Sequence, residues 1–121
     1  MSKVLPTGFA GVYEQHRTES LSLDQLLIKR PTATYFMQID GNLADAHIKQ
    51  GNIAIVDRSL DPKNGDLVVI VEDGSFAMRE FGKNCNSIYL TQLSNNKTTE
   101  LTDSIELWGV VTAIVQQLRC D

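Results

Sequence analysis

The side chains of this 121-residue chain that could bind a metal ion or form disulfides are few and scattered. The two cysteines, Cys85 and Cys120, lie far apart and form no CxxC pair, and the two histidines are His16 and His47. Zinc sites and disulfide frameworks need several such residues at short, regular spacing. We therefore expect no metal site, no cofactor and no disulfide framework, and the free thiols fit a reducing cytosol.

Composition argues against two further classes of protein. Charged residues make up 21% of the chain and the formal net charge is −4, so the surface should not attract phosphate backbones over long range. No apolar run approaches the eighteen residues of a membrane span, and residues 1–9 lack the apolar stretch of a secretory signal. The sequence predicts a cytoplasmic protein with no direct contact to nucleic acid and none to a membrane.

The chain is long enough for one domain and too short for two ordinary ones. Residues 1–20 show no clear periodicity and predict an extended N-terminal arm, in which Phe9, Val12 and Tyr13 are possible anchors. Hydrophobic residues make up 42% of the sequence, which is enough for a packed core in residues 21–121.

The first regular element expected in this domain is a short helix. Ser22 can cap its N-terminus, Gln25 follows three residues later, and leucines recur at helical spacing until Pro31 stops the helix. One face of this helix is therefore apolar. A short helical turn can also form over residues 44–48.

The rest of the chain alternates β-prone runs with turn signals. Strands are expected at residues 33–39, 53–57, 67–72, 75–81, 87–93, 98–101 and 105–118. Asp73-Gly74 predicts a tight hairpin, and Gly109 predicts a bulge or bend within the last strand. About seven short strands with one N-terminal helix favour a mostly β, partly barrel-like single domain.

Several segments, in this order and at matching spacing, resemble the UmuD family. They read LDQLLIKRPTATYFMQIDG, GNIAIVDRS, GDLVVIVEDGSF and LWGVVTAIV, and the resemblance covers about residues 8–118. UmuD proteins share a peptidase fold with the LexA repressor and with phage repressors. The resemblance thus implies a LexA/UmuD-like β domain over residues 21–121.

The resemblance also implies self-cleavage by a Ser/Lys dyad, in which a neutral lysine accepts the proton of the serine that attacks a backbone carbonyl. The family's serine lies in a Gly-Asp-Ser-Met turn, but residues 40–45 read DGNLAD, one residue shorter. Asn42 either replaces the serine or stands for the preceding Asp, and neither placement supplies a hydroxyl. The family's lysine falls on Arg79, which stays protonated and cannot act as a base. We therefore expect no enzymatic activity.

Other groups offer no evident substitute for the dyad. Asp40 and Asp45 flank the turn, where Asp is common for conformational reasons. The remaining serine and lysine candidates, none of which falls where the family's pocket would be, are Ser59, Ser75, Ser87, Lys49, Lys63 and Lys83. An active self-cleaving serine peptidase is the least favoured of the hypotheses.

The N-terminus resembles the processed form of the family, UmuD′. Family members are cut at a Cys-Gly or Ala-Gly bond followed by Phe, and Thr7-Gly8-Phe9 aligns with that point. Thr7 and Gly8 are thus interpreted as a vestigial cleavage point. An engineered truncation could also explain the short arm, but it would not explain Arg79.

The resemblance implies a non-catalytic accessory subunit of an error-prone translesion polymerase in the SOS response. Its partners would be a second copy of itself, a UmuC-type Y-family DNA polymerase and the RecA filament. Alternatively, the chain is a decoy or regulatory dimerisation partner of LexA-type repressors or of full-length UmuD. The resemblance places candidate dimer contacts, each of which could instead be a plain core residue, at Leu107, Trp108, Val110, Ile114, Asn42 and Ile48.

Overall fold

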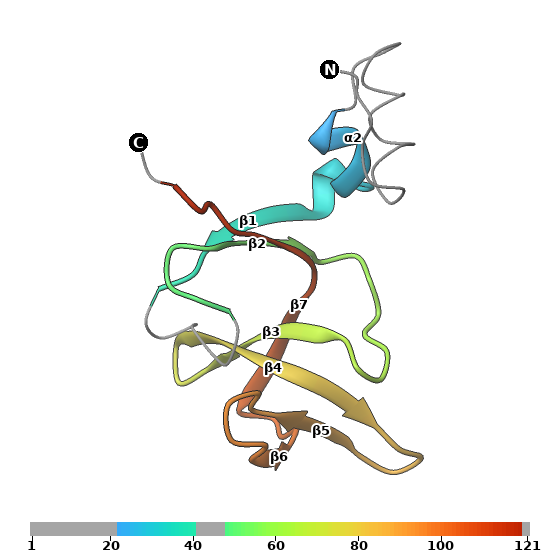
Figure 1. The fold of residues 1–121 in the computed structure, drawn as a ribbon. Helices are drawn as coiled ribbons and strands as arrows, with labels where there is room; N and C mark the ends of the chain where they lie inside the picture. Colours follow the sequence, from blue (N-terminus) through green and yellow to red (C-terminus); the bar gives the residue numbers. More distant parts are fainter. Residues whose placement is uncertain (1–21, 41–47, 120–121) are drawn as a thin grey trace, which may run out of the picture.

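A computed structural model of the chain describes residues 22–40 and 48–119 (Figure 1). The predicted arm over residues 1–20 and most of the predicted helical turn over residues 44–48 lie outside the described residues. The described elements, in chain order, are α2 (Leu23–Leu27), the 3-10 helix η1 (Pro31–Ala33), β1 (Thr34–Gln38), β2 (Ile53–Asp57), β3 (Leu67–Glu72), β4 (Ser75–Lys83), β5 (Ile88–Thr91), β6 (Thr98–Glu100) and β7 (Ile105–Val115).

All seven strands form one antiparallel sheet in the order β1-β2-β7-β3-β4-β5-β6. The mostly β fold with one short helix is therefore confirmed. The sheet is open, because β1 and β6 lie at opposite ends of this order and do not pair with each other. The domain was predicted to be partly barrel-like, and the sheet does not close into a barrel.

The long strand β7 joins the two parts of the sheet (Figure 1). Its first half pairs with β3 and its second half pairs with β2. The pairing with β3 steps from Gly109 to Leu107, which leaves Trp108 as the additional residue of a bulge. The bulge expected near Gly109 is thus confirmed. A Cβ atom at Gly109 would lie 2.6 Å from Cγ1 of Val56, so the close approach of β2 requires glycine there.

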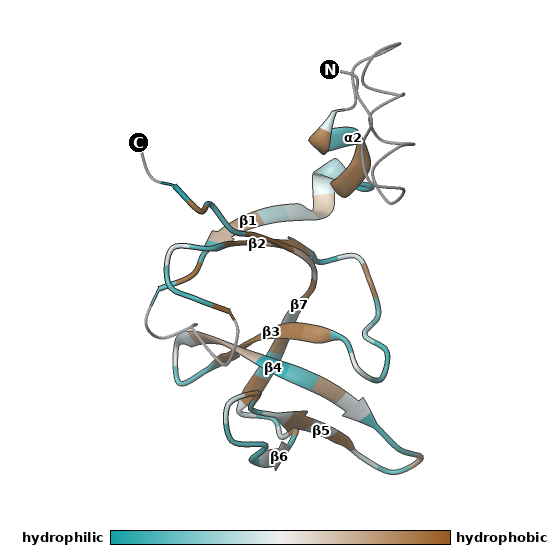
Figure 2. Cartoon of the chain, in the orientation of Figure 1, coloured by the Kyte–Doolittle hydropathy of each residue, from teal (hydrophilic) through white to brown (hydrophobic). Residues whose placement is uncertain are grey.

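Strand β3 is buried on both of its faces, and it appears as a hydrophobic band in Figure 2. Val69 packs in one cluster of buried residues, with Ile39, Ala54, Val56 and Met78. Its neighbours on the strand belong to a second cluster, composed of Val68, Ile70, Phe81, Leu90, Ile105 and Val110. Successive residues of a strand point to opposite faces, so these two clusters lie on the two sides of the sheet.

Helix α2 is shorter than its sequence pattern predicted. Ser22 caps it as expected, because its Oγ accepts a hydrogen bond from the backbone N–H of Gln25 at 3.4 Å. The helix already ends at Leu27, since Ile28 has extended backbone angles, and Pro31 begins η1 instead of stopping α2. Within the described residues, no helix is long and apolar enough to cross a membrane.

Candidate functional site

Of the two positions expected to carry the degenerate dyad, the structure describes Arg79 but not Asn42. Asn42 lies outside the described residues, as do the predicted cleavage residues Thr7 and Gly8. Arg79 lies in the middle of β4, opposite Val68 on β3. Its side chain is partly buried, and one Nη1 hydrogen bond goes to the carbonyl oxygen of Met78 at 2.7 Å.

The orientation of Arg79 follows from the alternation along β4. Met78 packs in the first cluster, while Ala77 and Phe81 pack in the second. Arg79 shares its face with Ala77 and Phe81, because residues two apart on a strand point the same way. A guanidinium on this strand donates hydrogen bonds and carries a positive charge, but it has no lone pair with which to accept a proton.

Three aromatic rings meet where β7 bulges. The ring of Trp108 lies 5.2 Å from that of Tyr35 on β1, and equally 5.2 Å from that of Phe76 on β4. Both contacts are edge-to-face, with interplanar angles of 62° and 74°. Tyr35 and Phe76 keep 46% and 40% of their surface exposed. These rings therefore form an aromatic surface patch assembled from three separate strands.

Arg58, just after β2, completes this patch. Its guanidinium carbon lies 4.4 Å from the ring centroid of Trp108, within range of a cation–π interaction. Its Nε donates to the carbonyl oxygen of Trp108 at 2.8 Å, and its Nη2 lies 3.8 Å from Oε2 of Glu106. We refer to Tyr35, Arg58, Phe76 and Trp108 together as the aromatic cluster.

The other predicted dimer contacts are distributed between core and surface. Val110 is only 4% exposed and belongs to the second cluster, so as folded here its side chain is a core residue and is unavailable to a partner. Leu107 is partly buried against that same cluster, whereas Ile48 and Ile114 are partly buried against the first. Among the described candidates, the aromatic ring of Trp108 and its neighbours therefore form the most coherent surface.

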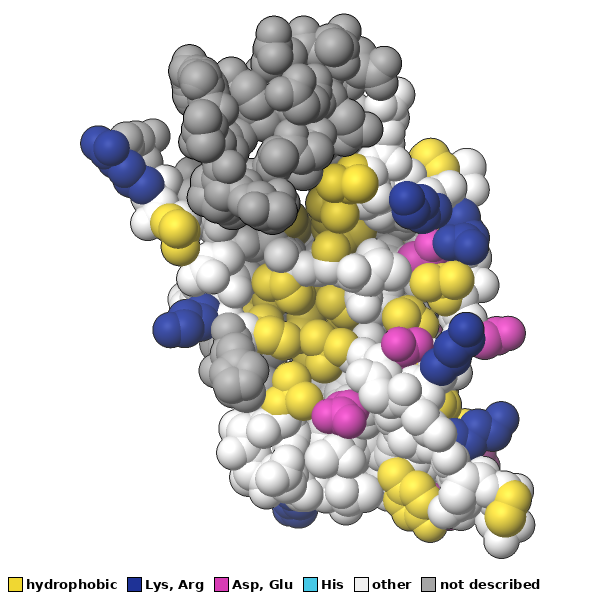
Figure 3. Space-filling view, turned by 45° about the vertical axis from the view of Figure 1, so that its right-hand side comes forward, with side chains coloured by type: hydrophobic (Ala, Val, Ile, Leu, Met, Phe, Trp, Pro, Cys, Tyr) yellow, Lys and Arg dark blue, Asp and Glu magenta, His cyan; other side chains and the backbone are white. Residues whose placement is uncertain are grey.

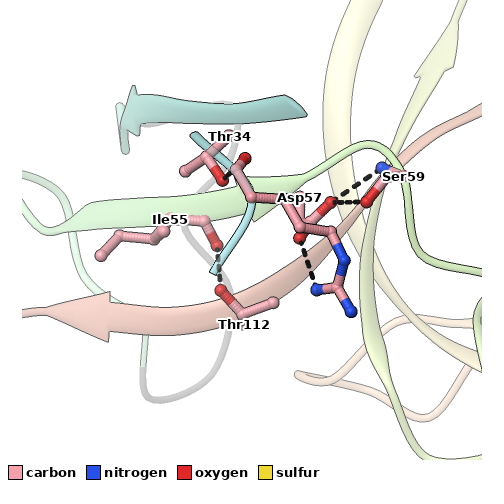
Figure 4. A network of polar contacts seen from close by, with 6 residues as sticks. Thr34, Ile55, Asp57, Ser59 and Thr112 are labelled. Atoms are coloured by element: carbon pink, nitrogen blue, oxygen red, sulfur yellow. Dashed lines mark hydrogen bonds and ion pairs between the residues drawn. The ribbon is translucent and has the colours of Figure 1, made fainter. Parts of the chain in front are cut away.

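A buried carboxylate fixes the end of β2 (Figure 4). Asp57 is 4% exposed, and its Oδ1 accepts hydrogen bonds from the Ser59 hydroxyl at 2.6 Å and from the Ser59 N–H at 2.8 Å. Its Oδ2 accepts from Nη1 of Arg30 at 3.2 Å. The Ser59 hydroxyl bond, above all, lowers the pKa of Asp57, against the opposing effect of burial. The Ser59 hydroxyl is thus engaged in a structural bond.

An apolar groove lies between α2 and the sheet. Its lining includes Leu23, Leu27, Phe36, Ile53, Ile55 and Val115. Phe36 points away from the aromatic cluster, because its neighbour Tyr35 lies on the opposite face of β1. Figure 3 shows that hydrophobic side chains gather in the middle of one face of the molecule, with charged side chains mostly near its margins. Among the described residues, no group of three His, Cys, Asp or Glu side chains could hold a metal ion.

Comparison with known proteins defines the family. The sequence model of the Peptidase S24-like family matches residues 3–112, and the chain therefore belongs to this family. It is similar to protein SamA of Salmonella typhimurium (strain LT2), with 28% identity over 115 residues that cover 94% of this chain and 81% of SamA. It is similar to protein MucA of Escherichia coli, with 26% identity over 112 residues, or 89% of this chain and 77% of MucA.

The chain is also similar to the LexA repressor of Opitutus terrae, with 31% identity over 72 residues that cover 57% of this chain and 36% of the repressor. These matches and the observed sheet confirm the UmuD-like LexA/S24 fold that the sequence segments indicated.

Sequence patterns did not identify Tyr35, Phe76 and Arg58 as neighbours of Trp108. The rings come from β1, β4 and β7, and neither β1 nor β4 is hydrogen-bonded to β7 in the sheet. The one available signal was Gly109, whose predicted bulge marks the place where Trp108 leaves the regular ladder.

Proposed function

We propose that the protein is a non-catalytic, UmuD′-like accessory subunit of an error-prone translesion DNA polymerase in the SOS response. In this proposal it acts as a homodimer that binds a UmuC-type polymerase together with the RecA filament. The observation that carries the proposal is Arg79, which occupies the strand position where the family resemblance expects the lysine base. The similarity to SamA and MucA supports the assignment to damage-induced mutagenesis.

The charge of Arg79 supports the non-catalytic part of the proposal. A serine hydroxyl needs a neighbouring base to become nucleophilic, and a lysine can serve once an apolar pocket lowers its pKa. A guanidinium stays protonated even when it is partly buried, as Arg79 is. The sequence of residues 40–45 also lacks serine. If the family's dyad falls at these positions, as the resemblance implies, two independent requirements of the dyad are missing, and this supports the proposal.

The aromatic cluster supports the homodimer. Trp, Tyr and Arg are the residues most enriched among energetically dominant interface contacts, and Trp108, Tyr35 and Arg58 lie together at the surface. Phe76 extends the same patch and is 40% exposed. A partner covering these rings would bury apolar area that the single chain leaves in water.

Sedimentation and binding assays test the proposal. We expect a dimer mass at micromolar concentration, capture of a UmuC-type polymerase from a defined mixture, and a weaker dimer when Phe76→Ser alters the exposed patch. The matched control is Phe36→Ser, which changes an exposed aromatic on the opposite face of β1. A mass equal to one chain, or failure to bind the polymerase, would contradict the proposal.

A second function is favoured by the similarity to a LexA repressor, which covers only 36% of that repressor. A chain that shares one part of a repressor could form mixed dimers with it and so alter SOS repression. Pull-down with a resident LexA, compared with pull-down with the UmuC-type polymerase, separates this decoy function from the accessory function. Exclusive capture of LexA would favour the decoy.

An active peptidase is tested by incubating the protein with RecA filaments and full-length UmuD. We expect no cleavage product. A product that appears with the wild-type chain and disappears on Arg79→Ala would overturn the non-catalytic assignment.

A further inference from the structure

Asn64 is the one asparagine of the chain that is followed directly by glycine. The side-chain amide of an asparagine can be attacked by the backbone nitrogen of the next residue, and glycine favours the attack because it has no side chain to obstruct it. The pair lies in the turn before β3, where both residues are exposed and Gly65 has a φ of 92°. Water can therefore reach the reacting atoms without unfolding of the core.

Hydrogen bonds from this turn to β4 hold both of the reacting groups. The Gly65 N–H donates to the Phe81 carbonyl oxygen at 2.9 Å, and the Asn64 Oδ1 accepts from the Lys83 N–H at 2.5 Å. The attacking nitrogen must first lose its proton, and a hydrogen bond donated by the neutral N–H opposes that loss. The side-chain amide must also turn toward Gly65, and its bond to Lys83 opposes that rotation. The closed turn therefore slows the attack.

A second pair of hydrogen bonds closes the turn on itself. The Asp66 Oδ2 accepts from the Lys63 N–H at 2.8 Å, and the Asp66 N–H donates to the Lys63 carbonyl oxygen at 2.9 Å. The Asp66 carbonyl oxygen accepts from the Phe81 N–H at 2.8 Å. The turn lies at the surface, whereas Phe81 is 3% exposed and belongs to the second cluster. Surface turns open at a lower free energy than the core, so this turn can open while the cluster stays packed.

We propose that Asn64 is a site of spontaneous deamidation and that local opening of the turn over residues 63–66 sets its rate. Once the turn opens, the Gly65 nitrogen gives its proton to water and bonds to Cγ of Asn64, and the side-chain nitrogen leaves as ammonia. Water then opens the cyclic imide. Attack at the former side-chain carbonyl gives aspartate at position 64, and attack at the backbone carbonyl gives isoaspartate.

The isoaspartate product would change the turn permanently. Its backbone passes through the former side chain and is longer by a methylene group, so Gly65 and Asp66 cannot both keep their hydrogen bonds to Phe81. Aspartate keeps the normal backbone and an acceptor for the Lys83 N–H. We therefore expect isoaspartate, and not aspartate, to loosen the end of the β3–β4 pair.

Peptide mapping of the full-length protein tests both the site and its control by the fold. The protein is incubated at mildly alkaline pH, folded in buffer or unfolded in urea, and isoaspartate at position 64 is followed by mass spectrometry and by enzymatic methylation. We expect the product to form at least about tenfold faster in urea, because unfolding removes every hydrogen bond of the turn. Equal rates in the two conditions, or no product at position 64 in urea, would overturn the proposal.

Asp66→Ala tests whether the turn itself controls the reaction. This change removes the side-chain acceptor of the Lys63 N–H, so the folded variant should react about threefold faster or more than the wild type, with no difference in urea. The matched control is Asp61→Ala, which removes the same charge from an exposed position nearby and should leave the rate unchanged. Equal acceleration by the two changes would contradict control by the turn.

Urea dependence gives a second measurement if Asp66→Ala fails to fold. Below the unfolding midpoint of the wild type, the deamidation rate should rise less steeply with urea than the unfolded fraction reported by Trp108 fluorescence, because local opening exposes little surface. A rate that rises in proportion to the unfolded fraction would assign the reaction to global unfolding and overturn the proposal.

Discussion

Arg58 holds both the ring and the backbone of Trp108. Its guanidinium lies 4.4 Å from the ring centroid, and its Nε donates to the carbonyl oxygen of the same residue at 2.8 Å. Trp108 is the additional residue of the bulge in β7, and bulges leave such residues outside the regular ladder of hydrogen bonds. Arg58 thus supplies a hydrogen bond that the ladder does not, and it fixes the ring on which Tyr35 and Phe76 pack.

Replacing Arg58→Lys should destabilise the protein by about 1 kcal/mol, because lysine keeps the charge but loses the planar group and the Nε donor. Trp108 is the only tryptophan, so its fluorescence during urea unfolding reports directly on this region. The control is Lys63→Arg, a charge-conserving change on an exposed turn. Identical unfolding free energies for Arg58→Lys and the wild type would show that the guanidinium contributes nothing specific.

Gly109→Ala should be costly, since the new Cβ would lie 2.6 Å from Cγ1 of Val56, a residue with no exposed surface. Overpacking of this kind costs about 1–3 kcal/mol. Gly82→Ala is the matched control, because its Cβ would meet nothing nearer than the Tyr89 carbonyl oxygen at 3.8 Å. Chemical denaturation of both variants checks the prediction, and a cost for Gly82→Ala equal to that for Gly109→Ala would contradict it.

The local elements could be read from the sequence because strand and turn signals are local. The expected strands at residues 53–57 and 67–72 coincide with β2 and β3, and Asp73 and Gly74 both adopt the positive φ that a tight hairpin needs. The end of α2 was less accurate. Pro31 was expected to stop the helix, but the backbone is already extended at Ile28.

The residues that form the aromatic cluster could not be predicted from local sequence signals. Tyr35 and Phe76 are separated by three intervening strands in the sheet order, so only the three-dimensional course of the sheet brings them to Trp108. The sequence did not decide whether Val110 is a core residue or an interface residue, because apolar residues follow one another along β7. The bulges in β7 decide which of them face the core, and Val110 does.

The Asp57 carboxylate should contribute stability that depends on pH. Its pKa is lowered below 3.8 in the folded protein, chiefly by the Ser59 hydroxyl, so the folded state favours the charged form. The contribution is therefore complete above the unfolded pKa of about 3.9 and is lost as the pH falls through the lower folded value. We expect the unfolding free energy to fall more steeply below about pH 4 in the wild type than in Asp57→Asn.

Replacing Asp57→Ala at neutral pH should cost about 1–3 kcal/mol, because the hydrogen bonds that the buried, charged carboxylate accepts from the Ser59 N–H and hydroxyl are lost. Arg30→Ala is the control for the ion pair alone. The Arg30 side chain is 50% exposed, and removing it should cost at most about 1 kcal/mol. Thermal and urea unfolding separate the two, and a larger loss from Arg30→Ala would reverse the assigned importance of Ser59 and Arg30.

Alkaline pH offers a direct test of the proposal that Arg79 cannot act as a base. A lysine at this strand position would be partly neutral near pH 10, and a self-cleaving dyad would become more active there. The guanidinium stays charged at that pH, so we expect the wild-type chain to remain intact, as judged by the mass of the whole protein. Arg79→Lys alone should also remain intact, because residues 40–45 provide no serine hydroxyl. A fragment beginning at Gly8 in the wild type, absent from Arg79→Ala and from urea-unfolded protein, would show that this family member has kept its chemistry by another route.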